Sequence, residues 1–501
     1  MSIERRPTQL LRCAGAAIVL ALSACAVGPN YHPPARPTQD GYTAEGLPAQ
    51  TVSTGVAGPG GEAQSFEPGR DLPGEWWTLF GSAKLNALIE RAMANYPDIA
   101  VQQAALRGDR ESVRAEEGSF LPQVQGVGYA SRAQTPGALY FPGFPNFIEN
   151  FFEAEVGFSY TFDIFGKERR TVEGLQAQAL QQSFVLEASY LTLTSDVVTA
   201  AIQVASDRDQ IAATREIIAS EEQQLSIVQR LYGLGSKARS DVLQQQSTLA
   251  TARATLPPLQ QQLAVAEHNL AVLTGRSPRD AQPVELQLSD LNLPKDIPVS
   301  LPSSLVAQRP DIRQQAAVVH QMSAQIGIAT ANMLPQLTLT NTSFGNESTN
   351  AATLAEAATG VWSLGGQITA PLFQGGTLRA KRRAAVDAYD QAVAQYRLVV
   401  LQAFQKVADQ LTALQNDAQA LKAQRDAVEA AQATLNLIQQ QYAVGAVDSA
   451  TLLTAQNSYQ QARLSYVVSL ASRYTDTVTL FAALGGGWWH RNDPGTLPGL
   501  R

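Results

Sequence analysis

The chain has few of the residues that build disulfides or metal centres. Its 501 residues include two cysteines and four histidines. Both cysteines lie near the start, at positions 13 and 25, so the rest of the chain cannot form a disulfide in an oxidising compartment. Stability must therefore come from packing or from association of several chains. We expect no metal site and no cofactor.

Charged and aromatic residues are also scarce, at 16% and 7% of the chain. The net charge is −7, and −9 without residues 1–24, so a nucleic-acid partner is not expected. The histidines are scattered, and no HExxH, GxSxG or phosphate-loop motif occurs, which argues against an enzyme. A mean hydropathy of −0.11 excludes a bundle of membrane-spanning helices. The remaining composition, rich in Ala, Gln, Leu and Val, is typical of long helices.

Residues 1–24 contain the long apolar run of the sequence and have the pattern of a bacterial signal peptide. Three arginines precede an apolar stretch that is too short to span a bilayer. The LSAC sequence at residues 22–25 resembles a lipobox, in which Cys25 is acylated and becomes the first residue of the mature chain. The alternative is an ordinary signal peptide with an incidental cysteine. We expect an exported chain with a lipidated N-terminal segment over residues 25–82.

The chain contains the same pattern twice. A YPDI sequence at residues 96–99 recurs as RPDI at 309–312, and the LPQ of 121–123 recurs at 334–336. Both pairs are 213 residues apart, and later matches keep the same order. Such self-similarity predicts two structural repeats. We place them at residues 83–275 and 303–485, with a Pro-rich connection at 276–302 and a tail at 486–501.

Each repeat contains a stretch in which apolar residues recur every seven positions. The stretches run from Val197 to Tyr232 and from Val386 to Tyr442. A sustained spacing of seven is typical of helices that supercoil about their neighbours. Gly235 and Gly445 follow, at positions where a helix would end. The spacing predicts long helices over about 167–231 and 376–442.

A returning helix with the same spacing follows each of these glycines. The first, about 241–274, should be kinked at Pro257–Pro258, because proline removes a backbone donor and clashes with the preceding turn. The returning helices are shorter than the long ones. We expect short helices within 83–120 and 303–333 to fill the remaining length.

Segments of two-residue period lie between the short and the long helices. From Phe152 to Asp163, apolar residues alternate with glutamate and small polar residues. Strands of this length suit a tilted transmembrane barrel, and the neighbouring aromatic cluster is typical of a membrane interface. The alternative is a soluble hairpin packed on a core. We expect strands over about 123–131, 152–163, 336–344 and 362–372.

Four strands are too few to close a membrane barrel, and open strand edges are not tolerated in hydrocarbon. The chain must therefore associate, as a dimer or as a trimer by strand count. If the apolar side chains face lipid, the acids Glu153, Glu155 and Asp163 face a water-filled lumen. Carboxylates around a pore favour cations.

Several motifs spread over nearly the whole mature chain occur together. They are CAVGPNY at 25–31, WWTLF at 76–80, the two LPQ sequences, LFQGG at 372–376, AFQKVAD at 403–409 and ALGGGW at 483–488. Together they resemble the TolC-like outer-membrane factors, in particular the lipoprotein branch that serves resistance-nodulation-division efflux pumps. The resemblance implies a fold that is mainly α with transmembrane β. A homotrimer would form a long α-helical coiled-coil barrel continuous with a 12-stranded outer-membrane β-barrel and closed at its periplasmic tip.

One departure from the family concerns closure. The efflux branch commonly carries an LLDAQR sequence just after the second tip, and its Asp and Arg help to close the aperture. Here the sequence is LLTAQN at 452–457, so Thr454 and Asn457 carry no charge. Closure must rest on other residues, and the candidates near the tips are Arg239, Asp241 and Asp448.

The resemblance implies the outer-membrane channel of a tripartite efflux pump that exports small molecules. The chain would be lipid-anchored in the outer membrane of a Gram-negative bacterium and would extend into the periplasm. A periplasmic adaptor and an inner-membrane resistance-nodulation-division transporter would be its partners. Gly235 and Gly445 either receive the adaptor or serve only as helix terminators. The channel of a type I protein secretion system is the alternative function, because it has the same architecture.

Overall fold

The computed structural model describes residues 26–35, 37–39, 41–55, 60–139, 141–281 and 283–491, with the backbone alone at Asn341. These residues form two compact units. The sheet unit comprises the described parts of 1–34, 105–182 and 314–396. The helical unit comprises those of 35–104, 183–313 and 397–501. Both repeats contribute to each unit, because each repeat has one long helix and each long helix has residues in both units.

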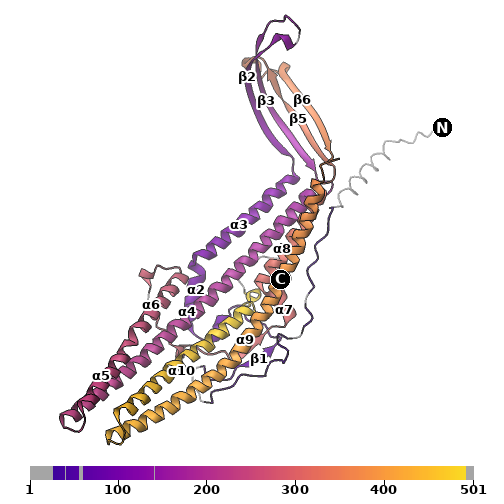
Figure 1. Cartoon of the computed structure of the whole chain (residues 1–501). Helices are drawn as coiled ribbons and strands as arrows, with labels where there is room; N and C mark the ends of the chain where they lie inside the picture. The colour runs from indigo at the N-terminus through magenta and orange to yellow at the C-terminus, as the bar shows by residue number, and fades with distance from the viewer. Residues whose placement is uncertain are drawn as a thin grey trace. The chain divides into compact units, whose positions relative to one another are not determined.

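The sheet unit is built on four antiparallel strands that lie side by side in the order β2–β3–β5–β6 (Figure 1). The central pair, β3 and β5, joins the two repeats, and β2 and β6 are the outer strands. Register shifts occur near Thr340 of β5 in its pairing with both neighbours. The strand bounds are β2 Gln123–Thr135, β3 Phe147–Phe162, β5 Gln336–Ser348 and β6 Gly360–Thr369.

The four strands occur where the sequence predicts them, but their bounds differ. Three are longer than predicted, because β2 and β5 continue by four residues and β3 begins at Phe147 rather than at 152. Backbone pairing continues there although the alternation of side chains has lapsed. The predicted end of β3 is confirmed to within one residue, whereas the predicted end of β6 was wrong. Asp163 lies outside β3, and residues 370–372 lie outside β6, where Pro371 has no N–H to donate to a neighbouring strand.

A row of large apolar side chains crosses one face of the sheet. Val156, Phe344 and Trp362 occupy paired positions on three adjacent strands. Their exposed fractions are 44%, 52% and 74%. In a soluble hairpin a core would cover such a row. The open row instead matches the lipid-facing surface of a membrane barrel.

The helices match the predicted periods closely. The two long helices are α4 (Lys167–Gly233) and α9 (Thr377–Ala443), each within two residues of its predicted bounds. The first returning helix is divided at Thr255, and Pro257 and Pro258 lie in the first turn of its second part. The interruption lies where the kink is predicted, and Thr255 itself keeps helical backbone angles, with φ −77° and ψ −20°. The returning helices are α5 (Arg239–Ala254), α6 (Leu256–Leu273) and the continuous α10 (Ser449–Ala483).

Residues of both seven-residue stripes are buried in the interior of the helical unit. Val197 and Val204 of α4 are fully buried, as are Val407 and Leu414 of α9. Among the described helices, α4 contains a stretch long and apolar enough to cross a membrane, a property it shares with buried helices of soluble proteins. The short helices are α2 (Ala83–Asn95), α3 (Pro97–Glu117), α7 (Pro302–Gln308) and α8 (Pro310–Ala331).

The N-terminal segment and the connection between the repeats pair with each other. Strand β1 (Ser65–Pro68) lies parallel to β4 (Asp296–Val299) within the predicted connection. The amide of Gln64 donates to Thr477 Oγ1 on α10 at 3.2 Å. Trp76 lies edge-on to Phe481 of the same helix at a centroid distance of 5.8 Å. The sequence did not predict this pairing, and the paired parts of both segments belong to the helical unit.

Candidate functional site

Each pair of long and returning helices is joined by a turn of the same geometry. Gly235 and Gly445 have φ angles of +77° and +78°. The residue after each glycine donates its N–H to a carbonyl five positions earlier, Ser236 to Leu231 and Ala446 to Gln441, both at 2.8 Å. This pattern is a Schellman motif, which requires a left-handed residue. Nothing lies within 4 Å of a Cβ at either glycine, so the backbone angle and not crowding selects glycine.

Two of the predicted gate residues are occupied by capping their own helices. Asp241 Oδ2 accepts a hydrogen bond from Ala238 N at 3.0 Å, which caps α5. Asp448 Oδ1 accepts from the Thr451 amide at 2.9 Å and caps α10, and bonds to Thr451 hold the pKa of Asp448 below its usual range. Each of these carboxylates therefore stabilises the start of a helix within its own helical hairpin, Asp241 in α4–α5 and Asp448 in α9–α10.

The other predicted gate residues face away from the packed interior. Arg239, Thr454 and Asn457 are exposed. The Thr454 hydroxyl donates to Ala450 O at 2.9 Å within the same helix. In the described part of the chain, these three side chains form no hydrogen bond or ion pair that joins the α4–α5 hairpin to the α9–α10 hairpin. A gating role for them remains a prediction.

Contacts between the hairpins come from residues that the sequence analysis did not assign to a site. Lys237 Nζ lies 3.7 Å from the centre of the Tyr442 ring, a cation–π contact between the two tips. Tyr442 also belongs to a buried apolar cluster with Val228, Leu435, Leu452 and Ala455, drawn from α4, α9 and α10. The seven-residue spacing had already predicted Leu435, Tyr442 and Leu452 as core residues.

A buried polar group lies beside this cluster. The Glu221 carboxylate on α4 accepts hydrogen bonds from the side-chain amides of Gln245 on α5 and Gln456 on α10. Burial raises the pKa of Glu221 above its ordinary value. The available sequence signal was Gln456, which lies inside the LLTAQN stretch, but spacing alone does not pair it with a residue 235 positions away.

The predicted lumen acids divide into two groups. Glu153 and Glu155 lie on β3 with their side chains on the same face, and Glu347 of β5 pairs directly with Glu153. The placement of Asp163 was wrong. Its carboxylate accepts from the Arg169 backbone at 3.1 Å and forms an ion pair with the Arg169 guanidinium at 3.0 Å. Because Arg169 neutralises it, Asp163 cannot add a free charge to the pore, whereas Glu347 is a candidate that the sequence analysis missed.

Cys25 lies outside the described residues, but the segment that follows it packs at a defined position on the sheet unit. Val27 N donates to Phe165 O at 3.0 Å. Gly28 has a φ of +94°, and a Cβ there would lie 2.5 Å from the Cα of Gly327, so only glycine fits. The buried Arg170 guanidinium donates to the Asn30 side chain at 2.9 Å.

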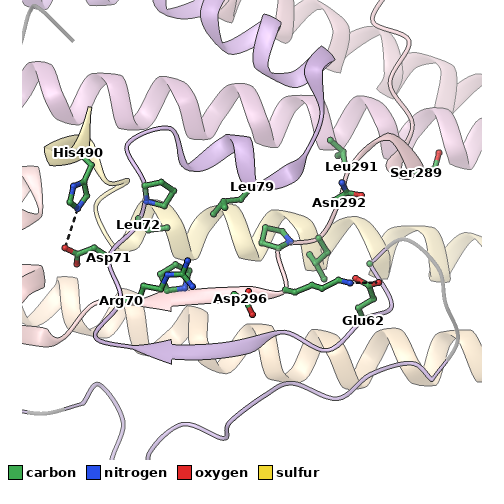
Figure 2. Close-up of a pocket in the computed structure, with 16 residues that line it drawn as sticks. Glu62, Arg70, Asp71, Leu72, Leu79, Ser289, Leu291, Asn292, Asp296 and His490 are labelled. Atoms are coloured by element: carbon green, nitrogen blue, oxygen red, sulfur yellow. Dashed lines mark ion pairs between the residues drawn. The ribbon is translucent and has the colours of Figure 1, made fainter. Parts of the chain in front are cut away.

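The N-terminal segment and the connection also border a groove of about 970 Å³ in the helical unit (Figure 2). Its rim carries two ion pairs, Lys295–Glu62 at 3.2 Å and His490–Asp71 at 3.6 Å. None of the predicted site residues lines it. Within the described residues, no cluster of three His, Cys, Asp or Glu side chains could hold a metal ion.

The sequence matches the family described as outer membrane efflux protein over residues 88–276 and 301–486. It is 28% identical to the probable efflux pump outer membrane protein TtgC of Pseudomonas putida, over 94% of each chain. It is 30% identical to the toluene efflux pump outer membrane protein TtgF of P. putida, over 94% of this chain and 96% of TtgF. The crystal structure of the Campylobacter jejuni CmeC outer membrane channel has the same fold, with a TM-score of 0.82, 21% identity and coverage of 94% and 96% of the two chains.

Proposed function

Since the chain belongs to the outer membrane efflux protein family and is the outer-membrane channel of a tripartite efflux pump, we propose that three copies of it close one pore. The observation that carries this proposal is the four-stranded sheet with two outer strands, β2 and β6. Hydrocarbon does not tolerate unpaired strand edges. Three such sheets joined edge to edge make a closed barrel of twelve strands, which lies within the known range of membrane barrels.

We propose that the cargo is small organic molecules and that the partners are a periplasmic adaptor and an inner-membrane resistance-nodulation-division transporter. Relatives of this chain are named for efflux of toluene and for export of pyoverdine. These names favour small molecules over the alternative of protein secretion. The adaptor would bind at the two tips, where the turns at Gly235 and Gly445 expose helix ends. The activity is transport, and we propose no catalytic step.

Conductance and mass of the purified protein test this function together. The full-length chain, expressed with its leader and extracted from outer membranes, should have the mass of a trimer by native mass spectrometry. In planar bilayers it should produce discrete conductance steps. Cells that lack the gene should accumulate a fluorescent efflux substrate, and the wild-type gene should reverse this accumulation. A monomer that conducts nothing in bilayers contradicts the proposal.

We also propose that Cys25 is acylated. The seat of Val27 and Gly28 on the sheet unit holds the chain that follows Cys25 close to the end of β3, so a lipid there would lie near the membrane-spanning sheet. An acyl chain adds to membrane affinity without replacing the barrel as an anchor. We expect Cys25→Ser to reduce retention in the membrane fraction more than it reduces export. Intact-mass analysis that finds an unmodified Cys25 in membrane-extracted protein refutes acylation.

A further inference from the structure

Glu221 lies where α4 meets two other helices, and its side chain is almost completely buried. The exposed fractions of Glu221, Gln245 and Gln456 are 3%, 6% and 5%. A single oxygen, Glu221 Oε2, accepts both amide hydrogen bonds, and the bond from Gln456 Nε2 is 2.9 Å long. Helices from both repeats therefore meet at one carboxylate. We call the three side chains of Glu221, Gln245 and Gln456 the Glu221 triad.

No cation accompanies this carboxylate in the described part of the chain. The cavity beside it has a volume of about 230 Å³, and its other titratable lining residues are Glu216, Tyr459 and Arg463. Arg463 of α10 pairs with Glu216 at 3.5 Å, and Arg253 of α5 pairs with Glu222 at 2.6 Å. The α9 residues that line the cavity, Gln432, Leu435 and Gln439, are not titratable. Among the described residues, the Glu221 carboxylate is hydrogen-bonded by the two amides and otherwise borders the cavity.

The triad also contains an acceptor without a donor. Gln456 Oε1 is buried and accepts no hydrogen bond from the described residues. An ionised carboxylate can only accept hydrogen bonds, whereas a protonated carboxyl can donate one to an amide oxygen. After a half-turn of its amide, Gln456 would accept that hydrogen bond through Oε1 in place of donating one through Nε2. The same three side chains therefore have two hydrogen-bonded arrangements that differ by one proton.

The triad lies close to the tips. Glu221 is about 18 Å along the helix from the end of α4 at Gly233, and Gln456 lies in the second turn of α10. The buried apolar cluster around Tyr442 is packed on α4, α9 and α10, two of which also carry the triad. Movement of α10 away from α4 must break the Gln456–Glu221 bond and expose the carboxyl group to water.

We propose that Glu221 is a positioning residue for channel closure and that the Glu221 triad is a proton-controlled latch holding α10 against α4 and α5. The latch would supply a polar contact between these helices in a chain whose residues 454 and 457, Thr454 and Asn457, carry no charge. The proposal rests on the proposed channel function. Burial disfavours the charged form, so the closed arrangement binds the proton more tightly than an open, hydrated one. Closure is therefore strongest at low pH and weakens as the pH rises through the raised pKa of Glu221.

Mean conductance in planar bilayers, measured at pH values from about 5 to about 8, tests the latch. For the wild type we expect conductance to rise with pH, by up to about tenfold in the closed–open equilibrium for each unit by which closure raises the pKa, per protomer. Glu221→Gln is the neutral isostere of the protonated state. It should hold conductance low and remove the dependence on Glu221 ionisation. The matched control is Glu222→Gln, which removes the exposed neighbouring carboxylate and should keep the wild-type response.

Gln456→Ala provides a second variant that deletes the latch from the other side. It should raise conductance at low pH, because it removes the hydrogen bond to α10, and a native trimer mass checks that each variant assembles. A Glu221→Gln channel with the wild-type pH response overturns the latch, as does a wild type whose conductance is independent of pH. Failure of the channel function itself would look different, because neither the wild type nor Glu222→Gln would then conduct.

Discussion

Arg473 lies at a position of α10 where the seven-residue pattern would place an apolar side chain, and it is fully buried. Its guanidinium donates to the carbonyl oxygens of Gly60 and Glu62, each at 2.6 Å, and to Thr51 Oγ1 at 3.1 Å. All three acceptors belong to the N-terminal segment. One charged side chain thus fastens this segment to α10, and hydrogen bonds offset part of the cost of burying the charge.

Asp417 of α9 should make stability depend on pH near neutrality. Burial, followed by a hydrogen bond with Asp476, raises the pKa of Asp417 to about 7. The folded chain retains a proton that the unfolded chain releases above about pH 4. This contribution to stability is full below about pH 4 and is lost as the pH rises through about 7.

We therefore expect the thermal unfolding midpoint of the detergent-solubilised trimer to fall between about pH 5 and about pH 8. Asp417→Asn should make that curve flatter, because its amide does not titrate. The control is Asp409→Asn, an exposed position on the same helix. Curves of equal slope for the wild type and Asp417→Asn would argue against a role for this carboxyl group.

At the scale of elements, the sequence predicts what depends on local period. Val407 and Leu414 are core residues because a spacing of seven keeps them on one side of a helix. The interruption before Pro257 follows from the missing N–H of proline, without reference to any neighbour. The positive φ of Gly235 and Gly445 likewise follows from position, since each comes just after the last periodic residue.

Pairings across long separations were not predictable from period. Strands β1 and β4 have four residues each and lie more than two hundred positions apart, so neither carries a usable alternation. The bond between Gln456 and Glu221 joins two helices whose relative rotation no sequence pattern specifies. Asp163 was misplaced because the alternation of side chains continues to it, whereas backbone N–H groups in the first turn of α4 donate hydrogen bonds to its carboxylate.

The tips provide a test at this scale. If the adaptor binds there, Gly235→Trp and Gly445→Trp should abolish most pump activity, because a large side chain would project from turns that are open to solvent. Gly235→Asn and Gly445→Asn are the matched controls, since asparagine tolerates positive φ and is small. Substrate accumulation in cells and cross-linking to the adaptor are the measurements. Tryptophan variants that form trimers and keep full activity would leave both glycines as helix terminators.

At the scale of the whole channel, the acids of the sheet should set ion preference. Glu153, Glu155 and Glu347 lie on one face of adjacent strands, and a trimer repeats each of them around the lumen. Such carboxylates favour cations, although screening over about 8 Å at physiological salt weakens the effect in a wide pore. We expect a modest cation preference that increases at low salt.

Replacing all three glutamates with glutamine should shift the reversal potential in a KCl gradient toward anion preference. Replacing Asp163 and Arg169 together with asparagine and glutamine removes a neutral ion pair and should leave the reversal potential unchanged. Planar-bilayer recordings at two salt concentrations measure both effects. If the triple variant and the wild type have the same reversal potential, these carboxylates only keep the lumen hydrated.

The seat of the segment after Cys25 has a consequence for the timing of folding. Gly28 packs against Gly327, and the Tyr31 hydroxyl donates to Ala316 O, a residue 285 positions later in the sequence. The amino-terminal end is made and exported first, yet the surface that receives it is completed only after most of the chain has followed. Long-range contacts of this kind form slowly. The first residues to reach the periplasm are therefore among the last to find their native neighbours, which leaves them accessible to processing enzymes in the meantime.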